Sequence, residues 1–266
     1  MNDRDKISRP LSGLTIGISI SEAEDLAAHG FTHTDVNLIT VELCRRFVAL
    51  GAGVNLGHQW RPGGIMEAVA QFARTYQEDL SAPVINNFLV FPEHAGLSQD
   101  DRRQLSRVVT IHEGEELRPK DDSQDRSAAL REMRQQMAEA TTGSVALSGR
   151  FRASKLAQSE DFVPGLVEET AIMLIQPRPK PVYLSRMMGG IASLLIDTLV
   201  SGRADIRHNL SPSHRLNLYL DQIAGFGVKK LAEVCRLTRP QLEEMFSAQN
   251  LDTIIQFTAL GLQSTL

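Results

Sequence analysis

The chain has 266 residues, is 42% hydrophobic and carries a formal net charge of −4, which predicts a globular protein with one sizeable core. The lack of a broad basic excess disfavours nucleic acid as its main partner. The chain has two cysteines and no CxxC pair, which argues against a disulfide framework. Its N-terminus is charged and no apolar run reaches roughly 18–20 residues, which argues against a membrane span. We therefore expect a soluble, cytoplasmic protein.

Strands and helices alternate through most of the chain. Leu14–Ile20 is a β-rich apolar run and predicts the first strand. Apolar residues then recur at helical spacing over Val36–Leu50, with Thr34 or Asp35 as the predicted cap and Gly51 ending the helix. Further strands are predicted at Gly53–Leu56, Ala82–Phe91, Arg107–Ile111, Ser144–Leu147 and Pro181–Leu184. Further helices are predicted near Ile65, at Ser127–Ala140, after Gly165 and at Ile191–Val200, while Asp100–Leu105 is expected to be helical at most briefly. This alternation predicts an α/β fold with a doubly wound, mostly parallel sheet.

The C-terminal part has a different pattern. A polar stretch from Ser201 to Arg215 predicts a linker or an inserted loop. Beyond it, apolar spacing predicts two to four short helices and no strand, near Leu216–Ile223, Val228–Val234, Arg239–Phe246 and Leu251–Leu260. We therefore expect a main domain over residues 1–202 and a helical extension over residues 203–266 that packs on the sheet edge or on a second subunit.

The segment Gly143–Leu184 predicts a strand, a loop, a helix and a second strand. The loop carries Gly149, Arg150 and Arg152, and the helix opens with Pro164-Gly165 and then Glu168-Glu169. Because the carboxyl end of a parallel strand and the start of the next helix share one sheet edge, these groups are expected at a ligand site. The alternative is a solvated basic loop and a favourable pair of charges in the first helical turn.

Two other junctions between a strand and a helix have similar chemistry. Gly57 and His58 precede Trp60, Arg61 and Pro62-Gly63-Gly64, a pattern that could present backbone N–H groups and a guanidinium to phosphate, or could form a plain tight turn. At the third junction, Arg186 precedes Gly189-Gly190, and Ser193 lies one turn into the helix. These glycines could serve an anion or simply permit close packing of helix on strand.

Other motifs exclude some functions. The segment from His112 to Asp125 is charged but lacks a framework for metal ligands, which predicts a solvated loop and no metal site. The chain has no Gly-x-x-x-x-Gly-Lys-Ser/Thr motif and no Gly-x-Gly-x-x-Gly after the first strand, which argues against a P-loop NTPase and an NAD dehydrogenase. We expect no bound cofactor. Ser19 and Ser21, at the end of the first strand, suit hydrogen bonding to ribose or phosphate better than nucleophilic attack, since the sequence places no histidine to activate them.

Three segments carry a family resemblance. Residues 57–67 read GHQWRPGGIME, residues 164–169 read PGLVEE, and the strand Pro181–Leu184 leads to Gly189-Gly190. In order and spacing over Leu14–Gly202 they resemble the SLOG superfamily, a Rossmann-like group that includes the Lonely Guy phosphoribohydrolases. The second segment is similar to a shortened form of the family pattern Pro-Gly-Gly-x-Gly-Thr-x-Glu-Glu. The longer basic loop before it departs from that pattern and argues against a simple nucleoside monophosphate as ligand.

The resemblance implies a nucleotide-derived ligand at the carboxyl edge of the sheet. Our leading hypothesis is a sensor of ADP-ribose-like or cyclic nucleotide signals in bacterial defence, working as a homo-oligomer with an effector protein as its partner. The alternatives are a nucleotide N-glycoside hydrolase, with Glu168 and Glu169 as catalytic residues, and a structural assembly protein. The residues assigned to ligand binding are Ser19, Ser21, Gly57, His58, Arg61, Gly63, Gly64, Gly149, Arg150, Arg152, Pro164, Gly165, Arg186, Gly189, Gly190 and Ser193.

Overall fold

A six-stranded, all-parallel sheet forms the centre of the protein. The computed structural model describes residues 9–58, 64–76, 84–90, 98–113, 122–152, 162–204, 210 and 213–264. Within these ranges the strands are β1 (Thr15–Ser19), β2 (Gly53–Leu56), β3 (Ile85–Leu89), β4 (Val109–Glu113), β5 (Gly143–Ala146) and β6 (Val182–Leu184). Their order in the sheet is β4-β3-β2-β1-β5-β6, and each neighbouring pair is parallel.

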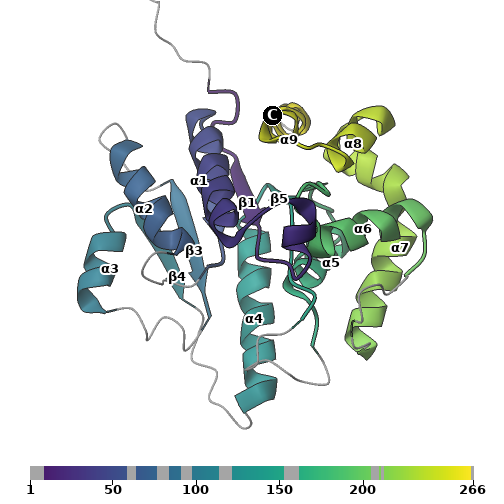
Figure 1. Cartoon of the computed structure of the whole chain (residues 1–266), viewed down its shortest axis with the longest axis horizontal. Helices are drawn as coiled ribbons and strands as arrows, with labels where there is room; N and C mark the ends of the chain where they lie inside the picture. The colour runs from purple at the N-terminus through teal and green to yellow at the C-terminus, as the bar shows by residue number, and fades with distance from the viewer. Residues whose placement is uncertain are drawn as a thin grey trace, which may run out of the picture.

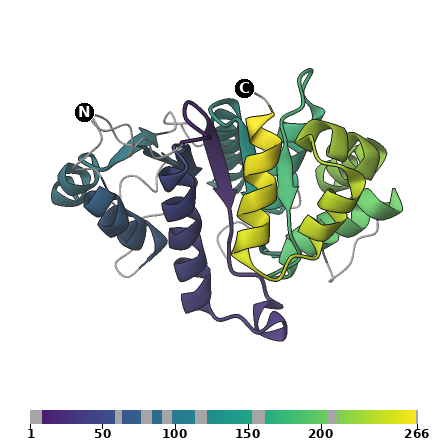
Figure 2. The same cartoon turned by 90° about the horizontal axis from the view of Figure 1, so that it is seen from above.

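Helices cover both faces of this sheet. The described helices are α1 (His33–Ala49), α2 (Ile65–Tyr76), α3 (Gln99–Leu105), α4 (Asp122–Glu139), α5 (Gly165–Ile175), α6 (Gly190–Ser201), α7 (His214–Cys235), α8 (Arg239–Phe246) and α9 (Leu251–Gln263), together with a short 3₁₀ turn, η2 (Leu26–His29). Figure 1 shows their arrangement. Figure 2 shows α1 and α9 side by side on one face of the sheet, with α4 on the other.

The order of the strands creates a reversal beside β1. The chain runs outward from β1 through β2 and β3 to the edge strand β4, then crosses back to add β5 and β6 on the other side of β1. The register aligns Ile18 with Val145 and Ser19 with Ala146, so β1 and β5 end at the same level. In open parallel sheets this reversal leaves a crevice at the carboxyl ends of the two strands, and ligands bind there. A ligand is therefore expected to bind beside the residues that follow Ser19 and Ala146.

The C-terminal helices share the core of the sheet. One apolar cluster contains buried residues from many parts of the chain, the first being Leu11 and the last Leu262, and it includes Leu216 on α7 and Leu242 on α8. The Tyr183 hydroxyl of β6 donates to the backbone oxygen of Cys235 at the end of α7, across 3.3 Å. The C-terminal helices α7 and α8 therefore contact the sheet at β6.

The predicted fold class is confirmed, and local differences have clear causes. The two predicted helices near Leu216 and Val228 correspond to two helical segments within α7, which meet at a kink at Gly227, where φ is 69° and ψ is 166°. Thr32 rather than Thr34 or Asp35 caps α1, because its hydroxyl accepts from the Asp35 N–H while the Asp35 carboxylate accepts from the Thr32 N–H. Among the described helices, none combines the length and apolar character needed to cross a bilayer.

Candidate functional site at the carboxyl edge

A serine and a glutamate meet where β1 ends. Ser19 is the last residue of β1, and its Oγ donates to Oε2 of Glu169, in the first turns of α5, across 2.5 Å. The Glu169 side chain is 19% exposed. Burial raises the pKa of the Glu169 carboxyl, while the positive charge of Arg134 and the Ser19 hydrogen bond oppose that rise. This carboxyl group has a raised pKa, is hydrogen-bonded to a hydroxyl and is partly exposed. Such a group can accept a hydrogen bond from a ligand hydroxyl or exchange a proton with the ligand.

A buried ion-pair network lies behind Glu169. Arg134 Nη1 on α4 lies 2.5 Å from Oε2 of Glu168, whose side chain is fully buried, and Arg134 Nε lies 3.8 Å from Oε1 of Glu169. Arg215, in the first turn of α7, lies 3.9 Å from the other Glu168 oxygen and donates to Ser127 Oγ across 3.0 Å. Glu168 therefore holds three helices together, and Glu169 is the member of the pair that faces the crevice.

Arg134 and Arg215 were not predicted as site residues from the sequence. Arg134 lies on the same face of α4 as Leu130 and Met137, so it interrupts the apolar stripe that we assigned to the core. A charged residue within such a stripe is rarely buried without a partner, and that was the available signal. Gly165 makes room for this arrangement, since a Cβ there would lie 2.9 Å from Nη2 of Arg134. No comparable pattern marks Arg215, which lies where we predicted a linker.

A small cavity lies between β1, β5, α4 and α5. Its lining includes Ser19, Arg134, Glu169 and Thr170, and the volume available to water is about 10 Å³, close to the space that one water molecule needs. The Thr170 hydroxyl is buried and has no hydrogen-bond partner among the described residues. A nucleotide cannot fit in this cavity, so a ligand of that size must lie on its open side, over Glu169 and the loops.

The loop after β5 brings basic groups to the same edge. Arg150 and Arg152 are exposed there, and the backbone N–H of Arg150 donates to Ser21 Oγ across 3.3 Å. His58, which follows β2, is held by two hydrogen bonds between its backbone and the side chain of Asn87, at 3.1 and 2.9 Å. Burial, and secondarily the positive charge of Arg150, lower the pKa of His58 to about 4, so its imidazole is neutral at pH 7.

At the junction between β6 and α6, a carboxylate of the protein itself accepts a hydrogen bond from the start of the helix. The backbone N–H of Gly190 donates to the Asp25 carboxylate, at 3.0 Å from Oδ1. A Cβ at Gly190 would lie 2.5 Å from the backbone oxygen of Gly149, so this glycine also permits close packing. Arg186 pairs with Asp197 on α6 across 2.7 Å, and Ser193 is half-buried in the first turn.

Some predicted site residues cannot be compared with the structure. Arg61 and Gly63 lie outside the described residues. Gly57 is exposed at the end of β2, and the Gly64 oxygen accepts from the Ala68 N–H at the start of α2. Pro164 caps α5 without a side-chain hydrogen bond.

Among the predicted site residues, the structure brings together at the carboxyl edge Ser19, Ser21, His58, Gly149 and Arg150, with the start of α5.

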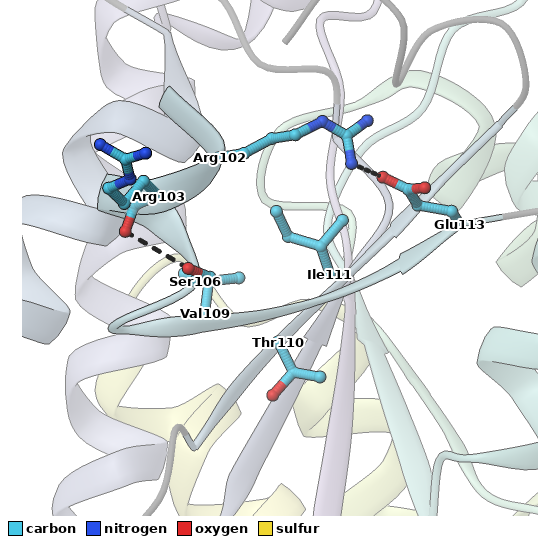
Figure 3. Close-up of a pocket in the computed structure, with 7 residues that line it drawn as sticks. All are labelled: Arg102, Arg103, Ser106, Val109, Thr110, Ile111 and Glu113. Carbon is cyan, nitrogen blue, oxygen red and sulfur yellow. Dashed lines mark hydrogen bonds and ion pairs between the residues drawn. The ribbon is translucent and has the colours of Figure 1, made fainter. Parts of the chain in front are cut away.

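A second hollow lies at the sheet edge, away from this crevice. Arg102 and Arg103 of α3 line an open groove of about 660 Å³ along β4, and Arg102 reaches across it to Glu113 (Figure 3). Within the described ranges, no cluster of three or more His, Cys, Asp or Glu could hold a metal ion. The carboxyl edge thus has the better-formed set of polar groups.

A comparison with known families identifies the family of the chain. A family model described as SLOG cluster2 matches residues 10–221, which include β1, the loops at the carboxyl edge and the start of α7. No curated protein matches the chain. Since the match covers most of the chain, the resemblance seen in three short segments is confirmed: the chain belongs to the SLOG cluster2 family and so has a nucleotide-related function in general.

Proposed function

We propose that the protein binds a nucleotide-derived ligand, of the ADP-ribose or cyclic nucleotide class, at the carboxyl edge, and that it acts as a sensor of such signals in bacterial defence. The observation that carries the proposal is the pair formed by Ser19 and Glu169 at the strand reversal, with Arg150 and His58 beside it. A carboxylate next to a hydroxyl suits the two hydroxyls of a ribose, and guanidinium groups suit phosphate oxygens.

The basic loop favours a ligand with two phosphates over one with a single phosphate. Arg150 and Arg152 are both exposed and stand two residues apart, so two guanidinium groups are offered at one rim. Each can pair with two phosphate oxygens. The neutral imidazole of His58 adds a flat, uncharged surface for a base or sugar.

The state of the two glutamates favours binding over hydrolysis. Glu168 is fully buried and paired with Arg134, so it is occupied in holding α4, α5 and α7. Glycoside hydrolysis usually requires two carboxyl groups beside the scissile bond, and of these two glutamates Glu169 alone is placed to face a ligand. One observation supports N-glycoside hydrolysis as the second candidate: the raised pKa of Glu169 suits a general acid.

Thermal denaturation with product analysis tests both candidates. The purified protein is melted with AMP, ADP-ribose, NAD, cyclic ADP-ribose isomers and cyclic dinucleotides, and each mixture is then chromatographed. A ligand at about 100 times its Kd stabilises the fold by about 2.7 kcal/mol, which shifts the melting temperature measurably. Intact recovered ligand supports the sensor, whereas released base supports the hydrolase. A panel without any shift contradicts both.

Variants locate the site. Arg150→Ala is expected to weaken binding at least tenfold, because a charge-assisted pair with phosphate is lost. Arg239→Ala, on α8, removes the same charge from a surface pair with Glu243 and is expected to leave affinity unchanged. Glu169→Gln separates the candidates: a hydrolase keeps binding and loses turnover, while a sensor shows no turnover with either side chain.

A further inference from the structure

The segment between β1 and α1 holds the loop that follows β5. Three consecutive backbone N–H groups, those of Arg150, Phe151 and Arg152, donate to it. The first donates to Ser21 Oγ. The second and third donate to the two oxygens of a single carboxylate, that of Glu24, each across 2.9 Å.

Consecutive N–H groups that converge on one point form a concavity that binds anions. Here the concavity is filled by a carboxylate of the chain itself, and the side chains of Arg150 and Arg152 stand at its rim, both exposed. The site therefore has the donors and the positive charge of a phosphate subsite. The Glu24 carboxylate stands where one phosphate group would bind.

We propose that Glu24 occupies the phosphate subsite of the free protein and that a phosphate group of the ligand displaces it. This rests on the proposed function, because it names the subsite and the competitor of the same ligand. The ligand class is a phosphate or pyrophosphate ester. A nucleoside that lacks phosphate does not compete with Glu24.

Displacement requires only a side-chain rotation. Glu24 is exposed, so its carboxylate can turn into solvent. The backbone around it is anchored separately, since Ala23 and Leu26 are buried and Asp25 accepts from the Gly190 N–H. A phosphate group carries a charge of about −1.5 to −2 and three acceptor oxygens, against one charge and two oxygens for the carboxylate, so it has the advantage beside two arginines.

Two neighbouring carboxylates give a matched pair of variants. Glu24→Gln removes one negative charge and places an amide NH₂ against one of the two N–H donors, so the internal contact is weakened. Asp25→Asn removes the same charge one residue away but changes only the contact with Gly190 and the ion pair with His29. General electrostatic attraction changes equally in both variants, and competition for the subsite changes in one.

The experiment is titration calorimetry of wild type, Glu24→Gln and Asp25→Asn with inorganic pyrophosphate, ADP-ribose and adenosine. We expect Glu24→Gln to bind pyrophosphate and ADP-ribose about tenfold more tightly than wild type, and Asp25→Asn to change either affinity less than twofold. Adenosine should show no gain. Equal gains in both variants, or no gain with Glu24→Gln, overturn the proposal.

A second measurement uses wild type alone, in case a variant folds poorly. Added pyrophosphate should shift the backbone amide resonances of Phe151 and Arg152 and leave that of Gly190 in place. Shifts at Gly190 without shifts at Phe151 contradict the proposed subsite. The two proposals fail separately. If Glu24→Gln binds ADP-ribose with the same affinity as wild type, the sensor stands and the competition by Glu24 is discarded. If neither wild type nor Glu24→Gln binds any phosphate compound, both proposals are discarded.

Discussion

Ser19 Oγ donates to the Glu169 carboxylate across 2.5 Å and joins the end of β1 to the start of α5, although 150 positions separate the two residues. Opposing effects act on the pKa of this carboxyl group, among them burial, the charge of Arg134, the serine hydrogen bond and the charge of Glu168. Burial raises its pKa, and the hydrogen bond stabilises the charged form and lowers it. The serine therefore keeps the carboxyl ionised over a wider pH range than its surroundings alone allow.

Ser19→Ala should consequently raise the pKa of Glu169 further, since it removes one of the groups that lower it. The measurement is a ¹³C NMR titration of the Glu169 carboxyl. Ser144→Ala is the control, because Ser144 lines the same cavity while Ser19 donates the hydrogen bond to Glu169. An unchanged or lower pKa in Ser19→Ala would count against the hydrogen bond.

The raised pKa also predicts how stability depends on pH. The folded protein holds the Glu169 proton more tightly than the unfolded chain, whose carboxyl titrates near 4.5. The contribution of Glu169 to stability is therefore fully present below pH 4.5 and is lost as pH rises through the folded-state pKa. Glu169→Gln lacks this loss, so its free energy of unfolding relative to wild type should increase with pH above about 4.5. Urea denaturation from pH 4 to 8 measures the difference, and a gap that is constant with pH contradicts the prediction.

Glu168 should matter to stability in a way that exposed glutamates do not. Glu168→Gln leaves the Arg134 guanidinium, 12% exposed, without its closest carboxylate, and removing one partner of a buried pair costs about 3 kcal/mol or more. Glu42→Gln also breaks pairs with two arginines, but on the surface of α1, where a pair contributes at most about 1 kcal/mol. Chemical denaturation of both variants should therefore give the clearly larger loss of stability for Glu168→Gln. Similar losses would show that Glu168 is solvated.

Much of the fold was readable because apolar periodicity is a local property. The apolar runs at Leu14–Ile20 and Ala82–Phe91 contain β1 and β3. Glycines between predicted strands and helices marked where one element ends and the next begins, and this alternation of strands and helices predicts a parallel sheet. The two segments of α7 were also predicted as separate helices, near Leu216–Ile223 and Val228–Val234, and the break between them lies at Gly227, whose φ and ψ are not helical. Their packing on α5 and α6 was not predicted, because it depends on contacts between residues far apart in the sequence.

Residues of the candidate site could be predicted from the sequence only where they follow strands. Ser19 and Arg150 were placed by the rule that carboxyl ends of parallel strands share an edge. Arg134 and Arg215 were not, because they reach the site from the middle of α4 and the start of α7. The carboxylate of Glu24 was equally hidden, since its partners are backbone N–H groups, which the sequence does not distinguish.

Arg150 should control the protonation of His58. Its positive charge is the second cause, after burial, of the lowered pKa of about 4. Arg150→Ala should therefore raise the pKa of His58, without returning it to 6.5, because burial remains. Arg152→Ala is the control, since its charge is not among the causes of the shift. Histidine ¹H NMR titration follows both variants, and an equal pKa in wild type and Arg150→Ala would place the guanidinium away from His58.

Two glycines should respond in opposite ways to alanine. Gly190 has a φ of +65°, and a Cβ there would lie 2.5 Å from the Gly149 oxygen and 2.7 Å from the Ala23 Cβ. The left-handed backbone and the clash together should cost about 2–5 kcal/mol in Gly190→Ala. Gly225 is exposed in α7, and its added Cβ would meet nothing within 4 Å. Gly225→Ala should therefore stabilise the protein by up to about 1 kcal/mol, through helix propensity. Urea denaturation measures both changes. Because the Gly190 N–H also holds Asp25, a tolerated Gly190→Ala would mean that the segment between β1 and α1 can move away from α6 at little cost.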